Sequence, residues 1–132
     1  MKTLITIKVV IAVIINKKNQ VLIAKRASHQ HQGDKWEFPG GKVEKGETPQ
    51  QALERELKEE VDITIHSAKS LTKISHKYTD KTVILDVYEV RNWSGDATGK
   101  EGQPLLWVDK AALNRYEFPA ANAEILSILS AL

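Results

Sequence analysis

Two apolar runs at the start of the chain have the composition of β-strands. Residues 4–15, LITIKVVIAVII, are rich in Ile and Val, and VLIAKR (21–26) follows the polar segment NKKNQ (16–20). β-Branched residues favour strands, and a short polar segment between two such runs predicts a turn. We therefore expect a hairpin. The first run is interrupted by Lys8 and, at about twelve residues, is too short to span a membrane.

Residues 48–61 carry the signals of one amphipathic helix. Thr48 can cap a helix, Pro49 suits the first helical position, and Gln51 completes a capping box with Thr48. Apolar residues then recur every four positions, at Leu53, Leu57 and Val61. This spacing predicts a helix from about 49 to about 61.

The rest of the chain predicts further strands and a second helix. The expected elements are a polar loop at 27–35, a short apolar piece at 36–38, strands at 68–77 and 82–90 around a turn at 78–81, a glycine-containing loop at 91–103, a strand at 104–109 and a terminal helix at 119–132. The order of strands, helix, strands and helix predicts an α+β fold. We expect an α/β/α sandwich, with a mixed sheet between the two helices.

The composition narrows the class of protein. A chain of 132 residues fits one domain, which we expect to span residues 1–132. The 19 Lys+Arg and 17 Asp+Glu residues give a net charge of +2, too small for a protein that coats nucleic acid. The absence of cysteine excludes disulfides, thiolate zinc sites and cysteine nucleophiles, and it is compatible with a cytoplasmic protein.

Three glutamates crowd one face of the predicted helix. Glu56, Glu59 and Glu60 stand at i, i+3 and i+4, where like charges cost about 0.2–0.5 kcal/mol per pair. On a helical wheel they adjoin the apolar stripe, and the small side chain of Ala52 is expected to leave open space beside them. Such a run is often a solvated charged face, with nearby basic residues as compensation. The other interpretation is a Mg²⁺ or Mn²⁺ site, because a cation bound by several carboxylates removes their repulsion.

The surrounding pattern decides between these interpretations by resemblance. Residues 41–63, GKVEKGETPQQALERELKEEVDI, resemble the signature of the Nudix hydrolases, GX5EX7REUXEEXGU, where U is an aliphatic residue. Every defined position matches except the last glycine, which is Asp62 here, and a pattern of this length is specific. That glycine follows the helix end in the family, so we expect Asp62 to cap the helix in a left-handed conformation. The alternative is that Asp62 adds charge near the metal site.

Three more segments resemble the MutT-type members of this family: WEFPGG (36–41), GKEGQP (99–104) and EFPAAN (117–122). The resemblance covers about residues 4–129. It implies a mixed sheet between helices and hydrolysis of 8-oxo-dGTP to 8-oxo-dGMP and pyrophosphate. Water attacks the β-phosphorus in this family, without a covalent enzyme intermediate, so no nucleophilic side chain is required.

The resemblance also implies which residues form the catalytic centre, with Mg²⁺ as cofactor and Mn²⁺ as a possible substitute. The expected metal-binding set is the backbone carbonyl of Gly40 and the side chains of Glu56, Glu59, Glu60 and Glu101. Glu56 is expected to act also as the base or to orient the water, and Glu101 to join the metal cluster or assist the base. Glu47 and Arg55 are expected to pair and hold the preceding loop against the helix.

The expected substrate-binding residues are Arg26, His31, Glu37, Phe38, Pro39, Gly40, Lys81 and Asn122. Asn122 carries a donor and an acceptor, which suits the edge of a guanine-type base and disfavours adenine. Phe38 and its neighbours are expected to line the base pocket, with Arg26 and His31 near the nucleotide. Lys81 stands where MutT-type proteins carry an arginine, and lysine cannot make the same planar bidentate contact.

Other functions share the same signature. A pyrimidine nucleotide pyrophosphohydrolase that acts on CTP, dCTP or a modified dCTP is one alternative, and a non-catalytic Nudix module that binds nucleotides is another. Decapping and dinucleoside polyphosphate enzymes usually carry added recognition segments, which are not evident in this short chain. The expected partner is a small nucleoside triphosphate, bound by a monomer that contacts neither a nucleic acid polymer nor a membrane.

Overall fold

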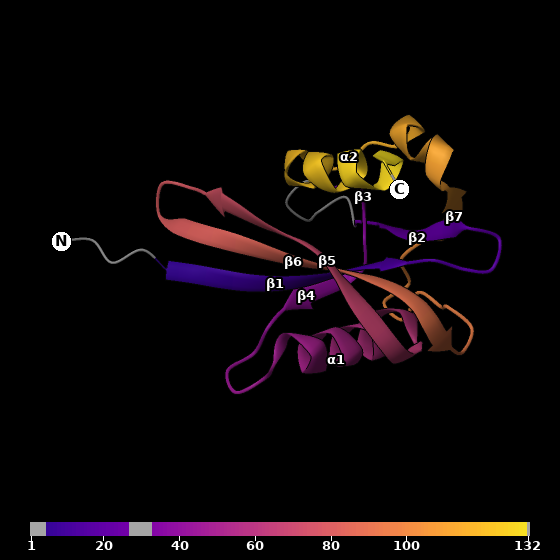
Figure 1. Ribbon diagram of the computed structural model, residues 1–132, viewed down its shortest axis with the longest axis horizontal. Helices are drawn as coiled ribbons and strands as arrows, with labels where there is room; N and C mark the ends of the chain where they lie inside the picture. The colour runs from indigo at the N-terminus through magenta and orange to yellow at the C-terminus, as the bar shows by residue number, and fades with distance from the viewer. Residues whose placement is uncertain (1–4, 27–32, 132) are drawn as a thin grey trace.

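The computed structural model describes residues 5–26 and 33–131. Its elements are β1 (Ile5–Ile14), β2 (Gln20–Lys25), β3 (Trp36–Glu37), β4 (Gly40–Lys42), α1 (Pro49–Val61), β5 (Thr64–Lys77), β6 (Lys81–Ser94), β7 (Leu105–Asp109), the 3₁₀ helices η1 (Lys110–Arg115) and η2 (Ala120–Asn122), and α2 (Ala123–Ala131). Figure 1 shows α1 on one side of the strands and α2 on the other. In this part of the chain, no helix is long and apolar enough to cross a membrane.

The strands form a four-stranded sheet in the order β4-β1-β6-β5 and a three-stranded sheet in the order β3-β2-β7. Strands β1 and β6 run parallel, whereas the other pairs are antiparallel, so the larger sheet is mixed. The α+β sandwich expected from the sequence is therefore confirmed. Strand β4 lies at the edge of the larger sheet and contains Gly41, the first residue of the segment 41–63 that matches the signature.

The predicted hairpin of residues 4–15 and 21–26 is wrong in its pairing. After the turn, β1 and β2 separate into different sheets and share only the bridge between Ile15 and Val21. The physical reason is that β1 is apolar on both faces from Val10 onward, so it is stable only in the interior of a layered structure. It obtains neighbours on both edges from β4 and β6, which lie further along the chain.

The two faces of β1 bury different helices. Val10, Ala12 and Ile14 pack in a cluster with the apolar residues of α1, including Leu53 and Leu57. The alternate residues Ile11, Val13 and Ile15 pack in a second cluster with Ile125 and Leu129 of α2. Successive side chains of a strand point to opposite faces, so one continuous apolar run supplies both halves of the core.

Three element boundaries differ by several residues from the sequence-based expectation, and two elements, β4 and η1, were not expected. Strand β5 begins at Thr64, β6 continues to Ser94, and α2 begins at Ala123 after the turn η2. The extension of β6 follows from a tertiary contact, because Trp93 stacks on Trp107 of β7 with ring centroids 5.7 Å apart. The edge strand β5 is largely exposed, so its apolar pattern is too weak to mark its start.

Helix α1 has the caps that the sequence predicts. The Thr48 hydroxyl accepts from the Gln51 amide, and the Gln51 side chain accepts from the Thr48 amide. Asp62 ends the helix in the left-handed region, at φ 57° and ψ 39°. The expectation for Ala52 is wrong, because this residue is fully buried against the sheet and leaves no open space. It belongs to the core cluster in which α1 packs on β1.

We expect Asp62→Gly to raise the melting temperature by a few degrees. A left-handed conformation costs a non-glycine residue about 1 kcal/mol, whereas glycine adopts it freely. The ion pair that would be lost, Lys58 Nζ to Asp62 Oδ1 at 3.3 Å, is exposed and contributes less than this strain.

Thermal melts of wild type, Asp62→Gly and Asp62→Ala test this prediction, and we expect the alanine variant to melt below wild type. A glycine variant that melts below wild type would contradict the cap interpretation, and a changed cation dependence of activity would show that the carboxylate acts near the metal site.

Candidate active site

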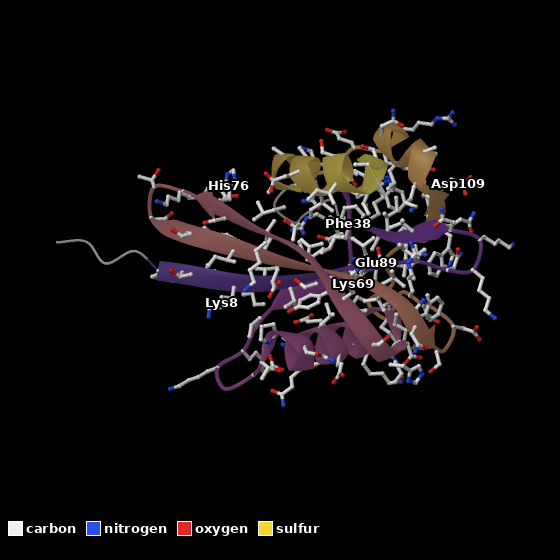
Figure 2. The ribbon with its side chains drawn as sticks, in the orientation of Figure 1. Lys8, Phe38, Lys69, His76, Glu89 and Asp109 are labelled. Atoms are coloured by element: carbon white, nitrogen blue, oxygen red, sulfur yellow. The ribbon has the colours of Figure 1, made fainter. Side chains whose placement is uncertain are left out.

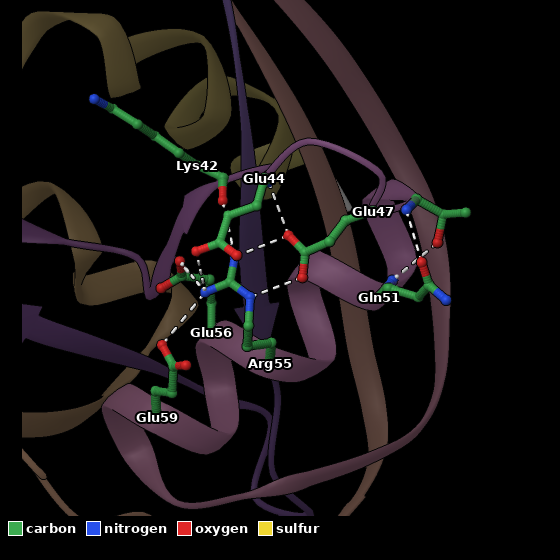
Figure 3. A network of polar contacts seen from close by, with 8 residues as sticks. Lys42, Glu44, Glu47, Gln51, Arg55, Glu56 and Glu59 are labelled. Carbon is green, nitrogen blue, oxygen red and sulfur yellow. Dashed lines mark hydrogen bonds and ion pairs between the residues drawn. The ribbon is translucent and has the colours of Figure 1, made fainter.

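Arg55 is the centre of a polar network on the first half of α1 (Figure 3). Its Nε and Nη2 donate to the two carboxylate oxygens of Glu47 at 2.7 and 2.9 Å, as the sequence predicts for this pair. Its Nη1 donates to Glu56 at 3.0 Å and to Glu59 at 3.3 Å, and Nη2 also reaches the carbonyl of Lys42 at 3.1 Å. One guanidinium therefore ties the loop before the helix to two of the three clustered glutamates.

The charge on Arg55 keeps its partner ionised. The hydrogen bonds from Arg55 lower the pKa of Glu47 to about 2, with a further contribution from the backbone amide of Glu44. The same contacts raise the pKa of Arg55 itself. The pair is thus fully charged over the physiological range, and its role is to hold the loop and the helix together rather than to exchange protons.

Two consecutive glycines of β4 allow close contacts, Gly41 with helix α1 and Gly40 with strand β1. A Cβ atom on Gly41 would lie 2.3 Å from the carboxyl carbon of Glu56, so any larger residue would displace that carboxyl group. A Cβ atom on Gly40 would lie 2.1 Å from the carbonyl oxygen of Val10 on the neighbouring strand. The glycines allow the helix, β4 and β1 to approach one another closely at this point.

Glu60 faces the same glycines from the last turn of α1. Its carboxyl group accepts a hydrogen bond from the Gly40 amide at 3.3 Å. Burial, with smaller contributions from the charges of Glu56, Glu37 and Glu101, raises the pKa of Glu60 to about 8, although the hydrogen bond from Gly40 opposes the shift. Burial also raises the pKa of Glu56, although the Arg55 guanidinium opposes this shift. The positive charge around Glu56 and Glu60 is therefore too small to offset the burial of their carboxyl groups.

A divalent cation fits this donor set. The donors are carboxylate oxygens, the ligands that Mg²⁺ and Mn²⁺ prefer, and a cation would relieve both burial and mutual repulsion. The predicted set does not converge as a whole: no three His, Asp or Glu side chains within residues 5–26 and 33–131 are arranged to hold an ion. Glu59 is exposed and turned toward Arg55, and Glu101 lies in an exposed loop. The structure brings Glu56 and Glu60 together with Gly40 and Gly41.

A pocket of about 480 Å³ opens beside these glycines. The predicted residues that line it are Arg26, Glu37, Phe38, Gly40 and Asn122. The wall also contains residues that were not predicted to bind substrate, which are Val9, Ile11, Gly41, Lys42, His76, Tyr78 and Pro119–Ala121. A larger hollow of about 890 Å³ near η1 and α2 has none of the predicted site residues among its described lining residues.

The base-pocket residues predicted from the sequence are held in different ways. Phe38 is buried beneath α2 and stacks on Phe118 with ring centroids 5.1 Å apart (Figure 2). Asn122 is buried at the end of η2, where its backbone amide donates to the carbonyl of Pro119 at 2.9 Å. Arg26 forms an ion pair with Glu37 at the pocket wall.

Two predicted substrate residues, Pro39 and Lys81, are placed differently. Pro39 is buried, and its carbonyl accepts from the Ala12 amide at 2.8 Å, so it joins β1 and β4 rather than lining the pocket. The Lys81 ammonium lies 5.5 Å from the ring centroid of Tyr78, and it is this ring that faces the pocket. His31 lies outside the described residues.

His76 and Tyr78 are two aromatic pocket residues that the sequence analysis missed. His76 lies in β5 near the tip of the β5–β6 hairpin (Figure 2), and Tyr78 follows the end of this strand, with the ring centroids 4.7 Å apart. The period-2 spacing of two aromatic side chains before a turn was the available signal. This spacing alone does not predict a binding role, because nothing local indicates that the hairpin reaches the pocket.

A model of the NUDIX domain family matches residues 10–127 of the chain. The chain belongs to the Nudix family. It is 40% identical over 126 residues to the 8-oxo-dGTP diphosphatase of Escherichia coli K12. The aligned residues cover 96% of this chain and 98% of that relative. It is 31% identical to the CTP pyrophosphohydrolase of the same organism, over 93% of this chain and 91% of that one.

The fold is also similar to solved Nudix structures. A structure from a study of MutT from Aliivibrio salmonicida and Vibrio cholerae superposes with a TM-score of 0.83 at 35% sequence identity, over 96% of this chain and 97% of that one. The resemblance drawn from residues 41–63 is therefore confirmed at the level of family and fold. The Nudix match also covers Asp62, so the family assignment does not depend on a glycine at that position.

We expect the cation-free protein to lose stability as the pH rises from about 4.5 to about 8. Glu60 keeps its proton in the folded state up to about pH 8, whereas an unfolded chain releases it near the ordinary value of 4.5. The folded state therefore binds more protons in this window, and the free energy of unfolding falls with increasing pH. Thermal melts in a chelating buffer at several pH values measure the effect.

Glu60→Gln is the matched variant for this measurement, because it removes the titrating group and keeps the side-chain length. We expect it to melt several degrees above wild type at pH 8 and to show a flatter dependence on pH. Equal slopes for the two proteins between pH 4.5 and 8 would contradict the role given to Glu60.

Proposed function

We propose that this protein hydrolyses 8-oxo-dGTP to 8-oxo-dGMP and pyrophosphate, as a single Nudix domain over residues 1–132. The observation that carries the proposal is that Gly40 and Gly41 serve two purposes at once. They line the 480 Å³ pocket and also contact the Glu56–Glu60 pair. A nucleotide with its base in the pocket would therefore present its phosphates to the two acids.

The proposed cation site consists of the Gly40 carbonyl with Glu56, Glu59, Glu60 and Glu101. Glu59 must leave Arg55 to take part, which is an accessible change because its side chain is exposed. Bound Mg²⁺ or Mn²⁺ would supply the positive charge that lets a triphosphate approach these acids and would lower the barrier to its cleavage. This donor set consists only of oxygens and therefore suits either ion.

Glu56 is the proposed general base. A bond forms between the water oxygen and the β-phosphorus, and the bond from that phosphorus to the oxygen bridging the α- and β-phosphates breaks. The nucleoside monophosphate leaves with the bridging oxygen, and pyrophosphate leaves with the water oxygen. The water proton passes to Glu56, whose raised pKa suits proton abstraction. Arg55 fixes the orientation of Glu56 by its 3.0 Å hydrogen bond, and Glu101 assists from the neighbouring loop.

Recognition of the base is proposed to depend on Asn122 and Phe38. The buried amide of Asn122 can pair with the acceptor and donor on the edge of a guanine-type base, while Phe38 supplies an apolar wall. Arg26 and Glu37, already paired with each other, are proposed to contact the nucleotide together. His31 and Lys81 complete the proposed substrate set, with Lys81 acting near the mouth of the pocket beside Tyr78.

A substrate panel tests the choice of nucleotide. We expect kcat/KM for 8-oxo-dGTP to exceed that for dGTP, CTP and 5-methyl-dCTP by at least about 10-fold, since a site built for one base edge leaves its polar groups unpaired with another. The assay measures pyrophosphate release with Mg²⁺. The similarity to a CTP pyrophosphohydrolase makes CTP the decisive competitor, and a higher kcat/KM for CTP would replace this proposal by the pyrimidine alternative.

We expect Glu56→Gln to lower kcat by about 100-fold or more while the protein stays folded, because the amide cannot accept the proton. Glu54→Gln is the control, since Glu54 is exposed on the same helix and lies outside the network. Both variants are compared by pyrophosphate release and by circular dichroism. If Glu56→Gln released pyrophosphate at the wild-type rate, the proposed mechanism would be wrong. If wild type bound nucleotides without any turnover, the protein would be a non-catalytic Nudix module.

A further inference from the structure

The loop between β6 and β7 completes the end of helix α1. The last carbonyl groups of a helix lack partners within the helix. Here the Glu60 carbonyl accepts from the Lys100 amide at 3.0 Å, and the Val61 carbonyl accepts from the Thr98 amide at 2.9 Å. The loop that carries Glu101 is thus fastened to the same turn of α1 that carries Glu60.

One side chain in this loop forms a second link. The Nε2 atom of Gln103 donates to the Glu60 carbonyl at 3.0 Å, while its Oε1 atom accepts from the Glu101 amide at 2.8 Å. A carboxamide can do both at once because it has a donor and an acceptor on one planar group. Gln103 therefore connects the backbones of Glu60 and Glu101, two acids far apart in the sequence.

The backbone of the loop is shaped to bring this side chain back on itself. Gly102 has a φ of 79°, in the region that favours glycine, and its amide donates to the Gly99 carbonyl at 3.0 Å. A Cβ atom on Gly99 would lie 2.1 Å from the Gln103 carbonyl oxygen. Glu101 is held at the apex of a tight turn, close enough for its charge to raise the pKa of Glu60.

We propose that Gln103 is a positioning residue of the active site, whose amide fixes Glu101 at a set distance from Glu60 and Glu56. Without this link, the exposed Glu101 would sample many positions, and the acids would bind a divalent cation less tightly. The inference rests on the proposed function in assuming that these acids bind the cation.

Gln103→Met is the test variant, because methionine has nearly the same length and volume but forms neither hydrogen bond. We expect it to weaken Mn²⁺ binding by the nucleotide-free protein about 10-fold, the usual effect of losing a partner that orients a metal-binding residue. Binding is measured by calorimetry. With 8-oxo-dGTP we expect a similar loss in kcat at subsaturating Mn²⁺, and a KM for the nucleotide within about 2-fold of wild type. If Gln103→Met does not fold, Gln103→Ala takes its place.

Thr98→Ala is the matched control. It removes a hydrogen bond within the same loop, from the Thr98 hydroxyl to the Asp96 carbonyl at 3.0 Å, but leaves the Gln103 link intact. We expect its Mn²⁺ affinity to equal that of wild type. A Gln103→Met protein that melts at a lower temperature yet binds Mn²⁺ with wild-type affinity would show a purely structural role and overturn the proposal.

A double-variant cycle tests whether Gln103 acts through Glu101. In a Glu101→Gln background, Gln103→Met should weaken Mn²⁺ binding no further, because the group that it positions has already been removed. Losses in affinity that add would overturn the proposal. Since Mn²⁺ binding is measured without nucleotide, failure of the proposed substrate would leave this result standing, and the two failures are distinguishable.

Discussion

The active-site geometry depends on the close approach of helix α1 to strand β4. Gly41 leaves no side chain between the two elements, and the Glu56 carboxyl group fills the space where its Cβ would lie. Gly40 allows β4 to approach β1 at Val10, and its amide donates to the Glu60 carboxyl group. Carboxyl groups buried at such a contact are costly as anions, which explains why the pKa of both is raised.

The repulsion among Glu56, Glu59 and Glu60 is reduced differently on the two sides of the cluster. On one side, Arg55 binds Glu47 through two hydrogen bonds and reaches Glu56 and Glu59 with its remaining nitrogen. On the other side, Glu60 accepts from the Gly40 amide, lies beside Glu56, and retains its need for a proton or a cation. This asymmetry distinguishes Glu47, which two hydrogen bonds from Arg55 hold as an anion, from Glu60, which no guanidinium among the described residues neutralises.

The pocket joins parts of the chain that are distant in sequence. Its walls come from β1, from the segment around β4, from the end of β5 and from the turn η2 before α2. The loop that carries Glu101 reaches the same region through its bonds to the end of α1. The layered fold therefore brings together the acids of α1, the glycines of β4 and the turns that line the pocket.

The sequence by itself determined helix α1, its caps and its acidic face, because capping, a spacing of four and a left-handed end residue are local properties of consecutive residues. It also predicted the family, through the spacing of Gly41, Glu47 and the residues from Arg55 to Ile63. Only the tertiary structure decided that β1 and β2 part into two sheets, that Ala52 is buried, and that His76 and Tyr78 line the pocket. Those facts depend on which distant strands meet, and the packing of both faces of β1 sets them rather than any local pattern.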